Sequence, residues 1–277
     1  MNRDSDRVVL ITGASSGIGK SCAAYLSRRG FKVFGTGRQP TRCEEEYGML
    51  EMDVTDDASI HRAVKYVIDR EKRIDVLINN AGAALSGAVE DTAVEEARAQ
   101  FETNFFGVIR VTGAVLPFFR RQNHGLIINI SSIGGLISVP FTAFYCASKF
   151  AVEGISEALR FELKKFNIKV VLLEPGDIQS GLTRHRVRAE RSRHPGPYEE
   201  QFKTTLRVIE DDENNGATKE RVAEKIGEII GKRSPKLRYV VGKPQQRLAV
   251  LLKKVLPSAW YEKIIASHYK IAPPQSP

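Results

Sequence analysis

Two side chains that could transfer a proton stand four residues apart near the middle of the chain. Tyr145 and Lys149 occur in the run FYCASK (144–149), whose helical pattern places both on one face of a helix. A free phenol has a pKa of about 10, and a neighbouring ammonium favours its phenolate. Such pairs are also common on solvated helix surfaces. The pair therefore predicts a proton-transfer site only if other residues support it.

A glycine-rich turn follows the first apolar run of the chain. The run Val8–Ile11 leads into TGASSGIG (12–19), and a helical pattern comes next. Gly13 permits a tight turn, Gly17 lets the backbone approach a phosphate, and Gly19 allows close packing of the helix. The helix N-terminus adds free N–H groups and a partial positive charge. Glycines alone occur in any tight turn, but a strand, turn and helix in this order predict a pyrophosphate site.

The end of the second predicted strand indicates which dinucleotide binds. In folds that select NAD, an acidic residue at this position binds the 2′-hydroxyl of the ribose. Here the strand ends in FGTGR (34–38), and no acid follows until Glu44. Arg38 can instead bind a 2′-phosphate through its planar, permanently charged guanidinium. We therefore predict NADP(H), with a surface arginine of no consequence as the alternative.

These motifs resemble those of the short-chain dehydrogenase/reductase family, and the resemblance extends over residues 8–180. The turn has the family's TGxxxGxG spacing, NNAG (79–82) ends the fourth strand, and YxxxK and a PG segment follow in order. The resemblance implies hydride transfer between NADP(H) and a carbonyl or alcohol carbon. The cofactor-binding residues that it and the turn predict are Gly13, Ser15, Ser16, Gly17, Ile18, Gly19, Arg38, Asp53, Val54, Asn80, Ala81, Gly82, Tyr145, Lys149, Pro175, Gly176, Ile178 and Ser180.

The same resemblance implies the roles of four catalytic residues. Ser132, which precedes Tyr145 by 13 residues, matches the serine that hydrogen-bonds the substrate oxygen. Its neighbour Ser131 ranks second, because strand alternation should turn it away. Asn104 lies in an apolar helical stretch and matches the asparagine that holds a water between Lys149 and solvent. Tyr145 would exchange the proton with the substrate.

Two positions of the resemblance admit a second interpretation. Asp53, expected at the adenine, also stands where an aspartate could mark a helix start before Thr55 and Asp56. Asn-Ala-Gly after the fourth strand is favoured by turn chemistry alone. Ser180 replaces the family's threonine and keeps a hydroxyl.

Short apolar runs alternate with longer helical patterns, which is typical of a parallel sheet covered by helices on both faces. We predict an α/β, doubly wound Rossmann-type domain with a seven-stranded parallel sheet over residues 1–277. The predicted strands are 8–11, 32–36, 48–52, 75–78, 125–130, 169–173 and 237–241. The predicted helices are 17–29, 56–72, 93–122 with a break, 143–166 and 218–231.

Two segments fall outside this alternation. Residues 181–216 follow the cofactor and catalytic core of 1–180, have neither the strand nor the helix period, and are expected to form a long mobile loop or lid over the substrate. Residues 243–277 form a C-terminal extension with two helices and a Pro-rich tail. These helices mix apolar with basic residues, so they could lie on an anionic membrane or pack on the chain's own pocket or a partner subunit.

Composition excludes several other classes of protein. The net charge of +9 comes from residues 184–277, with 20 Lys+Arg against 11 Asp+Glu, yet no nucleic-acid-binding motif accompanies it. No apolar run is long enough to span a membrane, and the charged first residues are unlike a signal peptide, so a cytoplasmic location is expected. The three cysteines, Cys22, Cys43 and Cys146, have neither disulfide nor metal-site spacing.

The substrate is the least determined part of this prediction. The run around Ser132 and Tyr145, with RYVVG (238–242), resembles the 17β-hydroxysteroid dehydrogenase-like branch of the family. This implies a bulky apolar steroid-, retinoid- or lipid-like ketone or alcohol. The resemblance also implies a homodimer that pairs through helices 93–122 and 143–166. A catalytically silent NADP(H)-sensing protein is the alternative, and the presence of all four catalytic residues disfavours it.

Overall fold

The computed structural model describes residues 6–39 and 47–273. Cys43, Glu44 and the tail beyond Pro273 therefore lie outside the described residues. Cys22 and Cys146 are buried free cysteines.

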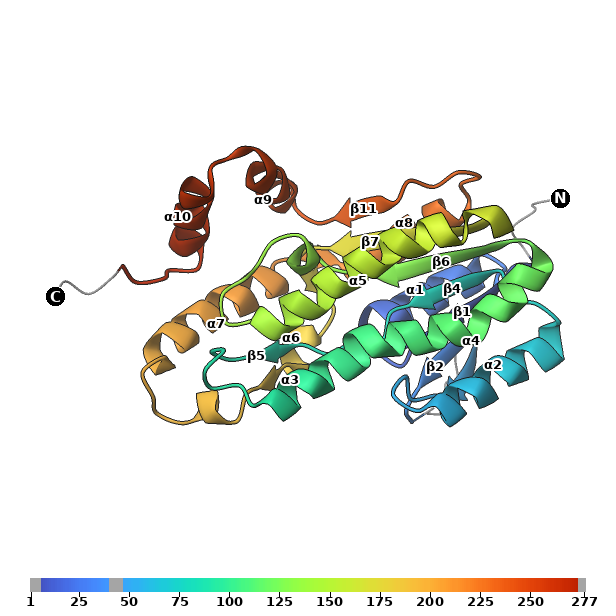
Figure 1. Cartoon of the computed structure of the whole chain (residues 1–277), viewed down its shortest axis with the longest axis horizontal. Helices are drawn as coiled ribbons and strands as arrows, with labels where there is room; N and C mark the ends of the chain where they lie inside the picture. The colour runs from blue at the N-terminus through green and yellow to red at the C-terminus, as the bar shows by residue number, and fades with distance from the viewer. Residues whose placement is uncertain (1–5, 40–46, 274–277) are drawn as a thin grey trace.

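The centre of the molecule is a seven-stranded parallel sheet with the strand order β11-β7-β6-β4-β1-β2-β3 (Figure 1). The strands are β1 (Val8–Ile11), β2 (Lys32–Gly37), β3 (Gly48–Glu51), β4 (Val76–Asn79), β6 (Gly125–Ile130), β7 (Ile168–Pro175) and β11 (Arg238–Val241). All seven predicted strands are confirmed, with ends shifted by at most two residues. The chain passes from β3 back across β1 to β4, so the loops that follow β1 and β4 diverge and open a crevice at their carboxyl ends.

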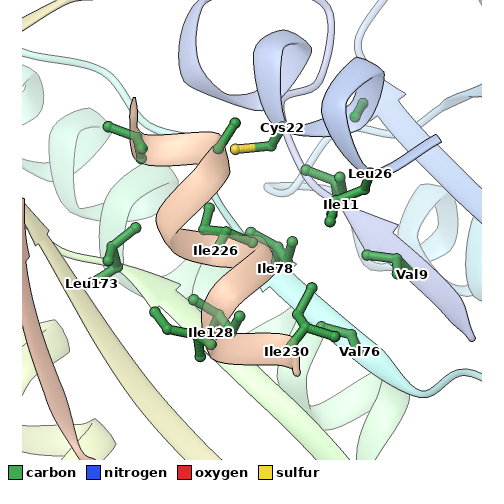
Figure 2. Close-up of a cluster of buried hydrophobic side chains, with 14 of the residues drawn as sticks. Val9, Ile11, Cys22, Leu26, Val76, Ile78, Ile128, Leu173, Ile226 and Ile230 are labelled. Atoms are coloured by element: carbon green, nitrogen blue, oxygen red, sulfur yellow. The ribbon is translucent and has the colours of Figure 1, made fainter. Parts of the chain in front are cut away.

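Strand β1 is apolar and buried at every position because helices cover both faces of the sheet. Successive residues of a strand point to opposite faces. Val9 and Ile11 thus pack on one side with α1 (Gly17–Arg28) and α8 (Lys219–Ile230), as Figure 2 shows. Val8 and Leu10 pack on the other side with α2 (Asp57–Glu71) and α4 (Gly107–Gln122). The Rossmann-type fold predicted from the alternation is confirmed.

The predicted break in helix 93–122 is a π-helical turn within a continuous helical stretch. This turn (Glu102–Phe106) joins α3 (Val94–Phe101) to α4 without a loop. Asn104 is buried in it. A π turn adds one residue to a helical turn and is frequent at functional sites.

The expectation of an irregular segment at 181–216 is wrong for much of its length. It contains the short α6 (Leu182–His185), the two-residue β9 (Val187–Arg188), which pairs with β5 (Leu85–Ser86), and the sixteen-residue α7 (Glu199–Asn214). The buried residues of α7 have helical spacing: Phe202, Thr205, Leu206 and Ile209. The polar Thr205 interrupts this apolar pattern in the sequence. In the structure it is buried, and its hydroxyl donates to the Tyr269 carbonyl at 3.3 Å.

The remaining elements complete the two ends of the fold. Helix α5 (Ala143–Glu162) crosses the sheet face beside β7, and β8 (Ile178–Gln179) pairs with β10 (Ala217–Thr218). Two helices end the described chain, α9 (Pro244–Val255) and α10 (Ser258–His268), as predicted. Within the described ranges, no helix combines the length and the apolar character needed to span a bilayer.

Candidate active site

The loops at the carboxyl ends of the strands line one cavity of about 1080 Å³. Its position is the crevice that the strand order creates between β1 and β4. Every predicted cofactor-binding residue except Gly19 lines this cavity, and so do Ser132, Tyr145 and Lys149. Residues from Gly13 to Ser180 therefore converge on one space.

The glycine turn has a backbone conformation that residues with a side chain would adopt only with strain. Gly13 and Gly17 have φ values of +65° and +55°. A Cβ on Gly13 would lie 2.8 Å from the Cα of Ala81, and one on Gly17 would lie 3.0 Å from the Ser180 carbonyl oxygen. Gly19 lies behind the turn, where a Cβ would overlap with the Gly13 carbonyl and the Asn80 amide. The turn thus lies close against the loops after β4 and β7.

The start of α1 leaves hydrogen-bond donors available to an anion. Ser16, the N-cap residue, is extended and its side chain makes no capping hydrogen bond, and the first turn carries no acidic residue. The first N–H groups of a helix have no partner within the helix. Together with the glycine cradle, this end of α1 fits the pyrophosphate of a dinucleotide.

The NNAG segment joins the end of β4 to the glycine turn. The Asn80 side chain donates to the carbonyls of Thr12 and Gly13 at 2.9 and 3.0 Å. In return, the Thr12 hydroxyl accepts from the N–H groups of Asn80 and Ala81. These contacts hold two loops of the cavity at a fixed separation. Asn79 instead points into the core, where its amide donates to the Asn129 side chain at 2.8 Å.

Two predicted positions at the adenosine end of the cavity differ in exposure. Arg38 directly follows β2, and its exposed side chain lies at the cavity wall. Asp53 is half-buried, and its carboxylate accepts from the N–H and the hydroxyl of Thr55. The helix start belongs to Asp56, whose side chain accepts from the Ala58 N–H. Asp53 therefore shapes the loop after β3 and does not cap α2.

Tyr145, Lys149 and Ser132 meet at the other end of the cavity. Tyr145 and Lys149 lie one turn apart near the start of α5, with the Lys149 Nζ 5.9 Å from the Tyr145 ring centre. Lys149 is buried and donates to the Ile130 carbonyl at 2.9 Å. The Ser132 hydroxyl accepts from the Gly134 N–H at 3.0 Å.

The environment of these groups determines their charge. Burial raises the pKa of Tyr145 to about 12, although its hydrogen bond with Ser132 acts in the opposite direction. Burial lowers the pKa of Lys149 to about 8, and the charge of Glu153 opposes this decrease. At neutral pH, Tyr145 is thus a neutral phenol that can donate a proton, beside a lysine that is still mostly charged. Ser131, the second-ranked serine, also lines the cavity, and its hydroxyl lies beside Glu153.

Asn104 connects the loop after β4 to α5. Its Oδ1 accepts from the Ala83 N–H at 2.8 Å, and its Nδ2 donates to the Ala83 carbonyl and to the Ser148 hydroxyl at 3.0 and 3.1 Å. The side chain is fully engaged and does not line the cavity. Its predicted part in holding a water for Lys149 stays a prediction.

Sequence patterns did not single out the residues at the far end of the cavity. Asp177, Arg186, Asp212, Glu213 and Tyr269 line it, and they come from the loop after β7, from 181–216 and from the C-terminus. Arg186 and Glu213 form a buried ion pair, and Arg186 also donates to the Ser86 hydroxyl at 3.1 Å. Burial, followed by the charges of Asp212 and Glu213, raises the pKa of Asp177 to about 7. No spacing rule relates these positions.

A buried pair of carboxyl groups behind the catalytic helix was also not predicted. Glu153 and Glu174 are both buried, and Arg238 forms ion pairs with both, at 3.0 and 3.1 Å. Burial, then the neighbouring charge of Glu153, raises the pKa of Glu174 to about 8. Glu153 lies one turn beyond Lys149 on α5, so its charge acts on the ammonium of Lys149.

Comparisons with known proteins agree with this geometry. A family model described as short chain dehydrogenase matches residues 7–191. The 3-ketodihydrosphingosine reductase of Bacteroides thetaiotaomicron is 43% identical over 265 residues, which cover 96% of this chain and 98% of that protein.

Solved structures give the same result. A short-chain dehydrogenase from Streptomyces avermitilis matches with a TM-score of 0.81 and 30% identity, over 96% of this chain and 98% of its own. The closed form of a serine dehydrogenase complexed with NADP+ matches with a TM-score of 0.73 and 25% identity, over 86% of this chain and 95% of its own. The chain belongs to the short-chain dehydrogenase/reductase family, whose members are NAD(P)(H)-dependent oxidoreductases acting on CH–OH groups.

Proposed function

We propose that this protein reduces the ketone of a long-chain, lipid-like substrate with NADPH. The observation that carries the proposal is the meeting of Ser132, Tyr145 and Lys149 in the same cavity as the phosphate-binding turn. The relative named 3-ketodihydrosphingosine reductase, similar over almost the whole of both chains, supports a lipid ketone. It favours the lipid-like part of the sequence prediction over a steroid, which the 17β-hydroxysteroid dehydrogenase-like resemblance had also allowed.

The proposed chemistry is proton transfer to an oxygen that two hydroxyl groups hold. When bound, the nicotinamide nucleotide supplies the hydride. Ser132 donates a hydrogen bond to the carbonyl oxygen and stabilises the charge that develops on it. Tyr145, a phenol whose pKa burial raises to about 12, gives that oxygen its proton. Lys149 places a positive charge beside the phenol and stabilises the phenolate that remains.

The preference for NADPH rests on Arg38. Its exposed side chain stands at the cavity wall, where a 2′-phosphate would meet a permanent positive charge. We expect Arg38→Ala to weaken binding of NADPH by at least about tenfold, as the loss of one charged hydrogen bond implies, and to leave binding of NADH nearly unchanged. Isothermal titration of both cofactors measures this. Equal affinities of the unmodified protein for NADPH and NADH would contradict the assignment.

The form of the cavity fits a ketone that has a long apolar part and a polar head. Ile133, Val139 and Ile209 are among its apolar lining residues, while the carboxylates of Asp212 and Glu213 lie at its far end. Carboxylates accept hydrogen bonds, so they favour a head group that donates them. This combination supports an amphiphilic lipid over a small apolar carbonyl compound.

Oxidation of NADPH in the presence of different ketones tests the proposed function. We expect turnover with 3-ketodihydrosphingosine to exceed turnover with a steroid ketone, retinal or a simple aromatic ketone. Tyr145→Phe should abolish turnover and leave NADPH binding intact, because only the phenolic hydroxyl is removed. No turnover with any of these ketones would favour the NADP(H)-sensing alternative. Turnover retained by Tyr145→Phe would show that another group donates the proton.

A further inference from the structure

The two C-terminal helices are apolar on two sides. Their inward sides are buried in a cluster that includes Val250 and Tyr261 together with Ile133 and Ile137 of the body. This packing agrees with one alternative expected from their amphipathic sequence, namely that the helices pack on the chain itself. It does not account for the apolar residues on their other sides.

The outward sides carry a second set of large apolar residues. On α9, Leu248, Leu251 and Val255 follow helical spacing and are 51%, 55% and 67% exposed. On α10, Trp260 and Ile264 lie one turn apart and are 66% and 43% exposed. We call these five residues the outer stripe. Apolar residues scattered singly on a surface are ordinary, whereas a stripe across two successive helices marks an interaction surface.

The place of these helices leaves the outer stripe free of the rest of the fold. In Figure 1, α9 and α10 lie at the margin of the molecule, away from α2 and α4. Lys253 of α9 donates a hydrogen bond to the Leu136 carbonyl of the body at 2.7 Å. The helices are thus held on the body with the outer stripe facing away from it.

The charge around the outer stripe indicates the partner. Residues 243–268 contain five Lys+Arg and a single acid, Glu262. Arg247, Lys254 and Lys263 are exposed on the same two helices as the stripe. A second copy meeting this face by two-fold symmetry would bring like charges together. The surface of a bilayer with anionic lipids accepts both components, since it takes apolar side chains below the headgroups and attracts lysine and arginine at them.

We propose that the outer stripe of α9 and α10 docks this protein on an anionic lipid bilayer. Trp260 suits this position, because indole rings prefer the boundary between headgroups and acyl chains. The surface lies next to the catalytic cavity: Tyr269, which follows α10, lines the cavity, and His268 contacts Asp212 of α7 at 2.8 Å. If the proposed function holds, a lipid ketone could enter the cavity from the bilayer. The docking itself does not depend on that function.

The single tryptophan of the chain provides a direct test. The full-length protein is mixed with vesicles of phosphatidylcholine alone, or of phosphatidylcholine with phosphatidylglycerol, and binding is measured by flotation. We expect binding to the anionic vesicles, a shift of Trp260 emission to shorter wavelength, and weaker binding at high salt. Binding that is equal on both kinds of vesicle, or absent from both, would overturn the proposal.

Substitutions test whether the outer stripe is the surface that binds the bilayer. Leu251→Glu should weaken binding to the anionic vesicles by at least about tenfold, as the loss of one buried apolar side chain implies, and Lys263→Gln by about fivefold. The control is Val89→Glu, which adds the same charge at an apolar residue that is 61% exposed and lies outside α9 and α10. It should bind as the unmodified protein does. Equal losses in Leu251→Glu and Val89→Glu would contradict the assignment.

Two further measurements distinguish docking on a bilayer from misfolding and from self-association. Circular dichroism and thermal melting check that each variant is folded. Light scattering measures the mass in solution: if Leu251→Glu reduces it without affecting vesicle binding, the stripe contacts a second copy and the proposal is wrong. Tyr145→Phe should bind vesicles like the unmodified protein, so failure of the proposed reaction would leave this result unaffected.

Discussion

Replacement of Lys149 should increase stability at neutral pH, and under the proposed function it should also remove activity. Lys149 is 6% exposed, and burial lowers its pKa to about 8 from an ordinary value of 10.5. The folded state therefore disfavours the charged lysine that the proposed reaction needs. Lys149→Met removes the charge, keeps most of the side-chain volume, and should relieve this cost.

The pKa values determine the expected magnitude. The pKa of Lys149 is lower in the folded state than in the unfolded state. Burial of Lys149 therefore costs no stability above about pH 10.5, and the cost grows as the pH falls towards about 8. At about 1.36 kcal/mol per pKa unit, the difference of 2.5 corresponds to about 3 kcal/mol at pH 7 and about 1.4 kcal/mol at pH 9.5. Removal of the hydrogen bond to the Ile130 carbonyl costs about 1–3 kcal/mol at either pH.

The test is therefore the change in the free energy of unfolding between two pH values, and not its value at a single pH. Urea unfolding of both proteins without cofactor, followed by circular dichroism, gives the free energy of unfolding at about pH 7 and pH 9.5. Relative to the unmodified protein, Lys149→Met should lose about 2 kcal/mol between these values. Lys164→Met removes an exposed lysine and should show no such change. Parallel curves for Lys149→Met would refute the argument that burial of the ammonium destabilises the fold.

Two more predictions follow from buried groups around the site. Gly19→Ala should weaken NADPH binding by about tenfold or more in a titration, because its Cβ would displace the Gly13 carbonyl and the Asn80 amide; unchanged affinity would mean that the turn adapts freely. Because the pKa of Glu174 is raised, the fold loses stability as the pH rises from about 4.5 to about 8. The variant Glu174→Gln should therefore be more stable than the unmodified protein. At about 1.36 kcal/mol per pKa unit, the gain should be about 4–5 kcal/mol near pH 9 and should disappear near pH 4; a gain independent of pH would contradict the role of its charge.

Features that depend on neighbours in the chain could be predicted from the sequence. Short apolar runs predicted all seven strands, since strands that helices cover on both faces are rich in apolar residues. The turn from Gly13 to Gly19 follows its strand directly, so its conformation needed only glycine and local order. The four-residue spacing of Tyr145 and Lys149 likewise fixes their common helix face. Helix α7 was missed although its spacing was present, because a polar residue, Thr205, occupies one of its buried positions.

Features that depend on contacts between distant segments were decided only by the tertiary structure. Lys149 has its lowered pKa because β6 and the rest of the fold bury it, and no local pattern reports burial. Arg186 and Glu213 reach the end of the cavity where Asp177 lies because 181–216 folds back over it. The sequence of α9 and α10 predicted amphipathic helices with two possible uses. Their packing against the body shows which side is buried and leaves the outer stripe exposed, because a helix can bury only the side that faces its support.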